Sequence, residues 1–275
     1  VFLITLTLMV GTAGLPHVII RFYTVPKASD ARWSAGWPLV FIGLLYTTAP
    51  AVAVFSKYNL LNTLANKPVE EVRQIDWVQK REQTGLLKLQ DKNGAGILQM
   101  SANPDVNEVT IDRDIIVLST PEVAKLSPFI VGLVAAGGLA AALSTAAGLL
   151  IVIASAISHD LYTRLINPGA SEATKLLIAR VVIFLVVVLA APFGINPPAF
   201  IAQLVAFAFG LAASTFFPAI LLGIFDRRMN MQGAVAGMIV GLVFTASYII
   251  GTKYLGWPNF ILGITAEGIG AIGML

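Results

Sequence analysis

Long apolar runs, separated by polar stretches, occupy most of this chain. Runs close to the length that spans a bilayer core, about 20 residues for about 30 Å, lie at 1–20, 37–55, 128–157, 176–193, 199–225 and 233–250. A seventh run begins near Thr265. The pattern predicts an all-α polytopic membrane protein: membrane helices in 1–55, an insert at 56–126, and further membrane helices in 127–275, of which the last is truncated.

Polar residues gather in the insert at 56–126. Its pattern predicts a small mixed structure, with an amphipathic helix over 69–83 that places Ile75 and Val78 on one face. Alternating stretches follow at 106–111 and 114–118, and such alternation is typical of strands. A connection of this length is usually functional or a regulatory lid.

The composition agrees with an integral membrane protein, because 57% of the residues are hydrophobic and 12% are charged, against about 25% charged in an average soluble domain. Basic residues follow alternate runs, namely Arg21, Lys27, Arg32, Arg164, Lys175, Arg180, Arg227 and Arg228. The opposite loops, 194–198 and 251–258, hold only Lys253. The positive-inside rule therefore places the first set in the cytoplasm and the insert on the extracytoplasmic side. No basic face of a soluble domain is left to bind nucleic acid.

The ends of the chain and its missing residue types limit the function further. The sequence begins inside an apolar run without an initiator Met and ends inside another, so we expect a fragment whose partner is the N-terminal remainder of the same protein. It has no cysteine, which excludes disulfides, thiolate metal sites and a Cys nucleophile. With two His and no HExxH, GxSxG or Walker motif, we do not expect an enzyme.

One helical face in the third run combines three oxygen-bearing positions. Ala141, Ser144 and Thr145 lie at i, i+3 and i+4, so one carbonyl and two hydroxyls share a face. A small hard cation such as sodium takes oxygen ligands of this kind. Alternatively, the two hydroxyls hydrogen-bond to carbonyls one turn earlier in their own helix.

The first run contains Gly11, Gly14 and Pro16. Pro16 removes a helical hydrogen bond, so we expect the helix to break or unwind there. Unwound backbone at membrane depth lines a cavity or is buried in protein. A simple kink at the cytoplasmic end is the alternative.

Several other polar groups in or next to the apolar runs have more than one interpretation. His17 is a proton relay or an interfacial residue, and Arg21 either closes an inner gate, for example on Asp160, or anchors the cytoplasmic side. His159 we expect to cap and to form a salt bridge in its loop. Glu267 is a functional carboxylate if its run is a continuous span, or it belongs to a helix that starts at Thr265. We prefer the helix start.

A short loop in the insert has the beginning of a calcium-binding pattern. Asp91 and Asn93 occupy the first and third ligand positions and Gly96 the sixth. Ala95 and Ala102 stand where further ligands belong, so an Asx- and Gly-rich turn is the better interpretation.

Three motifs in a fixed order give the chain a family resemblance. They are residues 11–21 (GTAGLPHVIIR), the run 139–148 (LAAALSTAAG) that closes at 158–162 (SHDLY), and residues 217–228 (FPAILLGIFDRR) followed by Gly233. With them the chain resembles the sodium/solute symporter family over essentially its whole length, and most closely the bacterial cation/acetate symporters. The resemblance implies part of a leucine-transporter-like inverted-repeat fold with ion and substrate sites at broken helices.

The resemblance implies that the face of Ala141, Ser144 and Thr145 binds sodium as the coupling ion, with no other cofactor. It also implies a substrate path along the first and fifth runs. Gly11, Thr12 and Gly14 would then lie nearest the substrate.

In the fifth run, Gln203 would flank that path by the same resemblance. Alternatively, its carboxamide forms a hydrogen bond between helices.

The function expected from the resemblance is secondary active transport. Sodium would drive uptake of a small organic solute, most plausibly a monocarboxylate such as acetate, across the plasma (inner) membrane of a bacterium, with membrane lipid around the protein. A proton-coupled carrier, a transporter-like sensor and a passive channel stay open as alternatives. We expect the fragment not to transport without the rest of the protein.

Overall fold

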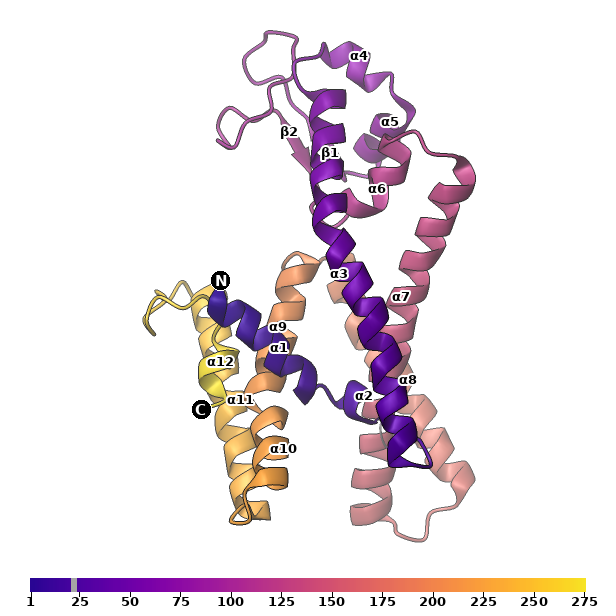
Figure 1. Cartoon of the computed structure of the whole chain (residues 1–275), viewed down its shortest axis with the longest axis vertical. Helices are drawn as coiled ribbons and strands as arrows, with labels where there is room; N and C mark the ends of the chain where they lie inside the picture. The colour runs from indigo at the N-terminus through magenta and orange to yellow at the C-terminus, as the bar shows by residue number, and fades with distance from the viewer. Residues whose placement is uncertain (21–23) are drawn as a thin grey trace. The chain divides into compact units, whose positions relative to one another are not determined.

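The structure, a computed structural model, describes residues 1–20 and 24–275. Within this part of the chain, the helical segments long and apolar enough to cross a membrane are Ala28–Leu64, Pro128–Ile166, Glu172–Ile195, Ile201–Phe225 and Met231–Tyr254. The described strands form one short two-stranded sheet. The predicted class, an all-α polytopic membrane protein with a small mixed insert, is confirmed (Figure 1).

The chain forms two compact units, Val1–Ala31 with Thr145–Leu275 and Arg32–Ser144. The first unit holds α1 (Phe2–Gly14), α2 (Pro16–Ile19), a π-helical segment (Ala156–Ile166), α8 (Glu172–Ile195), α9 (Ile201–Ser214), α10 (Phe216–Phe225), α11 (Met231–Tyr254) and α12 (Gly270–Gly273). The second holds most of α3 (Ala28–Leu64), then α4 (Val69–Arg73), α5 (Asp76–Gln83), β1 (Leu87–Leu89), β2 (Val109–Ile111), α6 (Ile116–Val123) and the first half of α7 (Pro128–Ser155).

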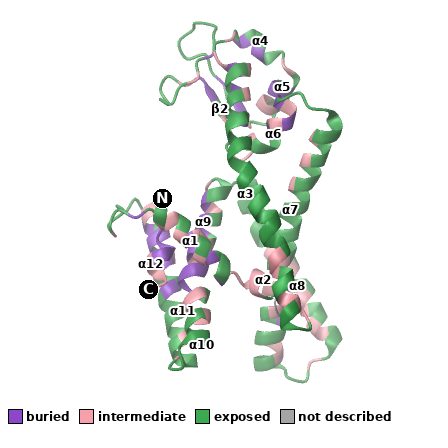
Figure 2. Ribbon diagram, in the orientation of Figure 1, coloured by how far each residue is buried: buried purple, intermediate pink, exposed green. Residues whose placement is uncertain are grey.

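The core of the first unit is built around α9, which contacts α1, α10, α11 and α12. Buried apolar side chains come from α9, α11 and the segment before α12, namely Phe207, Tyr248, Ile249, Ile264, Ala266 and Ile269. Figure 2 shows this burial concentrated on α1, α9 and α12. Because small residues line the buried faces, the helix backbones approach closely, as is common in membrane proteins.

The helices α3, α7 and α8 keep most of their apolar side chains exposed. Only 6% of the most apolar window of each is buried within the chain, and Figure 2 shows these helices largely exposed. Apolar surface of this extent is unfavourable in water, where a helix needs a polar face. These helices are therefore suited to contact lipid or further membrane helices.

The insert has a core of its own. The last turns of α3 contribute Leu60 and Leu64 to it, so this helix continues past the predicted boundary at residue 56. The strands pair antiparallel, with Leu87 opposite Ile111 and Leu89 opposite Val109. Alternate residues of β1 thus point into the core, as the two-residue period of a strand requires.

Two predictions within the insert are wrong. The helix expected over 69–83 is split into α4 and α5, because Ile75 is extended (φ −76°, ψ 123°). The break lets Val72 and Val78 both reach full burial. The stretch 114–118, expected as a strand, leads into α6, whereas 106–111 does contain β2. The partner strand β1 was not predicted.

The first and last apolar runs are not continuous helices. As predicted, the first breaks before Pro16, where Leu15 is extended (φ −73°, ψ 118°). The predicted helix start at Thr265 is wrong: residues 265–269 form turns in which the Gly268 N–H donates to the Thr265 carbonyl at 2.9 Å, and α12 begins at Gly270. Gly268, inside this stretch, disfavours an earlier helix start.

Candidate functional site

The predicted cation face lies on one continuous helix. Ala141, Ser144 and Thr145 all belong to α7, which is helical from Pro128 to Ser155, so their spacing of three and four residues does place them on one face. All three residues are exposed in this chain. A carbonyl and two hydroxyls at this spacing offer three oxygen ligands, about half of what a sodium ion takes.

The first helix uses its glycines for close packing. A Cβ at Gly14 would lie 2.6 Å from the Ala212 carbonyl oxygen, and one at Gly11 would overlap the backbone of Phe209. Both glycines are buried against α9, where the absence of a side chain allows the close approach. That they lie nearest the substrate stays a prediction. Thr12 is exposed, and its hydroxyl donates to the Leu8 carbonyl at 2.7 Å.

A second helix break adjoins the first. The run 199–225 divides at Thr215 (φ −115°, ψ −76°) into α9 and α10. The two breaks lie close together, because a Cβ at Gly14 would lie 3.2 Å from the amide nitrogen of Phe217, just beyond the second break. Ser214 and Thr215 both donate their hydroxyls to the Leu211 carbonyl, at 3.2 and 2.6 Å. This back-bonding is the habit of such residues in membrane helices.

A cavity of about 260 Å³ opens beside this second break. Its lining includes Ser214 and Thr215 together with Gly241 of α11 and Gly273 of α12. The two hydroxyls already donate to Leu211 O, so they have no proton left for an anionic solute. The volume would admit a small molecule, but the lining gives a carboxylate little to bind.

Gln203 and Glu267, considered separately in the sequence, lie together in the structure. The Gln203 side chain is 7% exposed, and its Nε2 donates to Glu267 Oε1. The alternative interpretation of Gln203 was a hydrogen bond between helices; the partner Glu267 lies in the turns before α12 and not in a helix. This bond uses one of the two N–H donors of the carboxamide, so the second N–H and the amide oxygen stay available to other partners.

Thr7 is a polar residue that the sequence analysis missed. It is fully buried, donates its hydroxyl to the Gly268 carbonyl at 3.1 Å and accepts the Ala271 N–H at 3.0 Å. A signal was present: Thr7, Gly11 and Gly14 lie at i, i+4 and i+7, which is one helix face.

The calcium-like loop of the insert is a turn. The Asp91 carboxylate accepts the N–H groups of Ala95 and Gly96 at 3.2 and 2.9 Å, and Asn93 Oδ1 accepts the Ala95 N–H at 2.8 Å. These oxygens hold the loop as Asx turns do. Nowhere in residues 1–20 and 24–275 do three His, Asp or Glu side chains gather as a metal site would require.

A second missed residue, Glu108, organises the same loop from inside. It is 2% exposed. Its Oε1 accepts the N–H of Lys92 at 3.0 Å and that of Asn93 at 3.4 Å, and its Oε2 accepts the Gln99 N–H at 2.7 Å. Its position before a short strand gave no sequence signal for burial.

The ionisable residues near the helix ends are placed as follows. His159 Nδ1 lies 3.0 Å from Asp160 Oδ1, and Arg164 Nε lies 3.9 Å from the same oxygen. The contact of His159 with an acid in its loop is as predicted, and it is a salt bridge when the imidazole is protonated. His17 lies on α2 in a partly buried position. Arg21, the predicted gate or anchor residue, lies outside the described residues.

Comparisons with known proteins point to one family. Residues 99–241 match the model of the sodium:solute symporter family. The chain is 42% identical over 250 residues to an uncharacterized symporter of Cupriavidus necator, covering 90% of this chain and 35% of that protein. It is 31% identical over 252 residues to a monocarboxylic acid transporter of Corynebacterium glutamicum, covering 87% and 36%. The chain thus spans about a third of the length of these curated relatives, and no solved structure matches it significantly.

Proposed function

Because this chain belongs to the sodium:solute symporter family, we propose that it forms part of a secondary active transporter that couples sodium entry to uptake of a small monocarboxylate. The observation that carries the proposal is the family match over 99–241, which includes the face of Ala141, Ser144 and Thr145. The monocarboxylic acid transporter of C. glutamicum supports the solute class. Acetate is the solute we test first.

The proposed ion site is the face on α7. Hydroxyl and carbonyl oxygens coordinate a hard monovalent cation without the charge of a carboxylate, and sodium prefers about five or six of them. Ala141 O, Ser144 Oγ and Thr145 Oγ would supply three. Another membrane helix would complete the shell.

The proposed coupling uses the two adjoining helix breaks. Transporters of the inverted-repeat class bind ions and substrates where helices are discontinuous, and α1 and α9 of this chain break within contact of each other. If bound sodium favours the outward-open state, the solute binds more tightly once the ion is present. The insert lies on the extracytoplasmic side of the plasma membrane in this proposal, since the basic loops follow the opposite helix ends.

The test is solute uptake by the full-length protein reconstituted in liposomes. An inward sodium gradient should drive concentrative uptake of labelled acetate, and Ser144→Ala with Thr145→Ala should abolish the sodium dependence. The matched control is Thr47→Ala, which removes a membrane-helix hydroxyl that donates to Gly43 in its own helix at 2.7 Å. Equal uptake without sodium would refute the proposal, as would a double variant with unchanged sodium dependence.

The same assay separates the alternative functions. A proton-coupled carrier would respond to an inward pH gradient in sodium-free buffer. A passive channel would equilibrate acetate without concentrating it, and a sensor would bind the solute without moving it. Propionate, pyruvate and lactate as competitors then define the solute class.

A further inference from the structure

The segment 264–273 is docked onto three helices through hydrogen bonds distant in sequence. Tyr248 of α11 donates its hydroxyl to the Ile264 carbonyl at 2.7 Å. Thr7 of α1 bonds both the Gly268 carbonyl and the Ala271 N–H. Ile269 between them is fully buried. The segment is therefore held from both ends and through its middle.

The backbone of this segment also lies directly against α9. A Cβ at Gly270 would lie 2.6 Å from the carbonyl oxygen of Gly210 and closer still to its Cα. No side chain can separate the two at this point, so their distance is fixed by backbone contact. A small sliding of α9 would have to carry the segment with it or break the contact.

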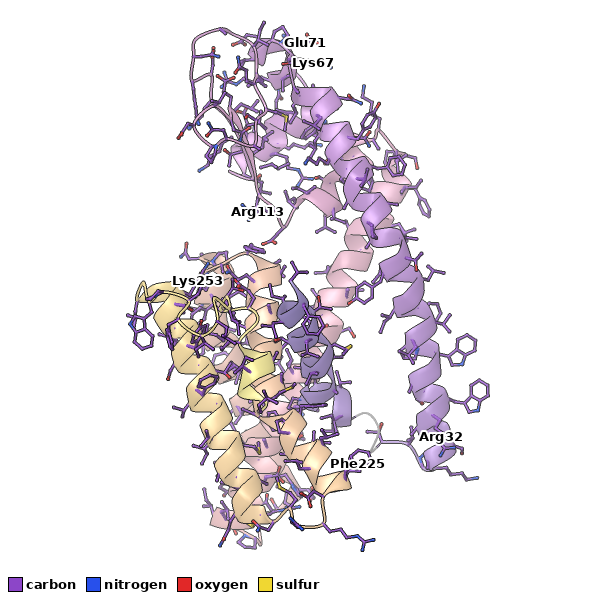
Figure 3. All side chains as sticks on the ribbon, turned by 60° about the vertical axis from the view of Figure 1, so that its left-hand side comes forward. Arg32, Lys67, Glu71, Arg113, Phe225 and Lys253 are labelled. Carbon is purple, nitrogen blue, oxygen red and sulfur yellow. The ribbon has the colours of Figure 1, made fainter. Side chains whose placement is uncertain are left out.

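The bond between Gln203 and Glu267 ties the first turn of α9 to this segment. It joins side chains 64 residues apart, and Gln203 is almost fully buried. The acidic partner is the less buried of the two. Figure 3 shows Lys253 at the end of α11 where the chain turns toward this segment, and Phe225 at the opposite end of the unit.

We propose that Glu267 is a positioning residue: it latches the segment 264–273 onto α9 and fixes the orientation of the Gln203 carboxamide. With one N–H of Nε2 held by Glu267, the second N–H and the amide oxygen of Gln203 are left to face other partners, and the bond decides which way they point. The part concerning transport rests on the proposed function, because Gln203 matters there only if α9 flanks the solute path. The latch itself does not depend on transport.

The first measurement is amide hydrogen exchange of the peptide that covers 264–275, in the full-length protein purified in detergent. Loss of one hydrogen bond should raise the open population, so Glu267→Ala should speed exchange about two- to tenfold. Glu267→Gln should stay near the parent rate, because its amide oxygen still accepts the Gln203 N–H. Unchanged exchange in Glu267→Ala overturns the latch.

A matched pair on α1 provides the second variant and its control. Thr7→Val keeps the side-chain shape but removes both bonds to the segment, and it should speed exchange at least as much as Glu267→Ala. Thr12→Val removes a hydroxyl that bonds only within its own helix turn, and it should leave the rate unchanged. Equal rates in these two variants would also overturn the latch.

The second measurement is the KM and maximal rate of solute uptake. Glu267→Ala should raise the KM while keeping most of the maximal rate, and Glu267→Gln should restore the KM. Faster exchange with an unchanged KM would refute the positioning of Gln203. If the full-length protein shows no sodium-driven uptake, the proposed function fails, and the exchange measurement still decides the latch.

Discussion

Gly14 is the position where a single methyl group tests the packing of the two helix breaks. A Cβ there would lie 2.6 Å from the Ala212 carbonyl oxygen, 3.1 Å from the carbonyl carbon and 3.2 Å from the Phe217 amide nitrogen. All three are backbone atoms, so no side chain can rotate away. Since real Cβ atoms essentially never approach closer than 3.0 Å, Gly14→Ala requires α1 and α9 to separate by at least about 0.4 Å.

The cost follows from this forced separation. Overpacking of a close contact costs about 1–3 kcal/mol. The better helix propensity of alanine, about 1 kcal/mol in a helix interior, offsets less than this amount because Gly14 is the last residue of α1. The matched control is Gly43→Ala on α3, where a Cβ meets nothing within 4 Å in this chain. This control gains the propensity term and has no clash with the chain.

The assay is thermal unfolding of the purified full-length protein, followed by its monodisperse fraction after heating. We expect Gly14→Ala to melt below the parent, at about 2–4 °C for each kcal/mol lost, and Gly43→Ala to melt at or above it. Uptake by Gly14→Ala should fall with the loss of packing. If Gly14→Ala and Gly43→Ala melt together, the close approach of α1 and α9 described here is wrong.

Two further predictions concern the insert. Glu108→Gln should lower the stability of the insert by about 1.5–3 kcal/mol, because a carboxamide accepts through one oxygen whereas the two carboxylate oxygens accept three N–H groups. Trypsin should then cut faster after Lys92 than in the parent, whereas the control Glu71→Gln, at the exposed tip of the insert (Figure 3), should leave the rate unchanged. Equal cutting rates in the two variants would contradict the buried role of Glu108. Ser56 Oγ lies 2.5 Å from Thr120 Oγ1, so cysteines at both positions should form a disulfide in an oxidising compartment. The disulfide would be visible as a gel shift that a reductant reverses. A failure to cross-link would contradict the contact between α3 and α6 at these residues.

The membrane class and the break before Pro16 could be predicted because each has a local cause, whereas the break at Thr215 was not predicted. Apolar length sets the spans, and Pro16 removes a hydrogen bond wherever its helix lies. The same local logic placed Ala141, Ser144 and Thr145 on one face, and α7 is continuous there. The ligands that would complete an ion site come from elsewhere in space, so no spacing within one helix could supply them.

The glycines of α1 show what local reasoning left out. The family resemblance placed Gly11, Thr12 and Gly14 together near the substrate, and that placement stays a prediction. A helical period of 3.6 separates Thr12 from the glycines and adds Thr7 to them, and the structure buries Thr7, Gly11 and Gly14 against α9 and the segment before α12. The buried faces of α9 and α11 have the same small and polar character, with Gly210 and Ser214 on one and Gly241 and Thr245 on the other.

The pairing of Gln203 with Glu267 changes what each residue means for function. Each, considered alone in an apolar run, is costly unless it has a partner or a task. No pattern along the chain pairs these two residues across 64 positions. Once they are joined, Gln203 donates one of its two N–H groups and the Glu267 carboxylate accepts it. The bond holds the segment before α12 in register with α9, and it fixes the direction in which the other N–H and the oxygen of the carboxamide point.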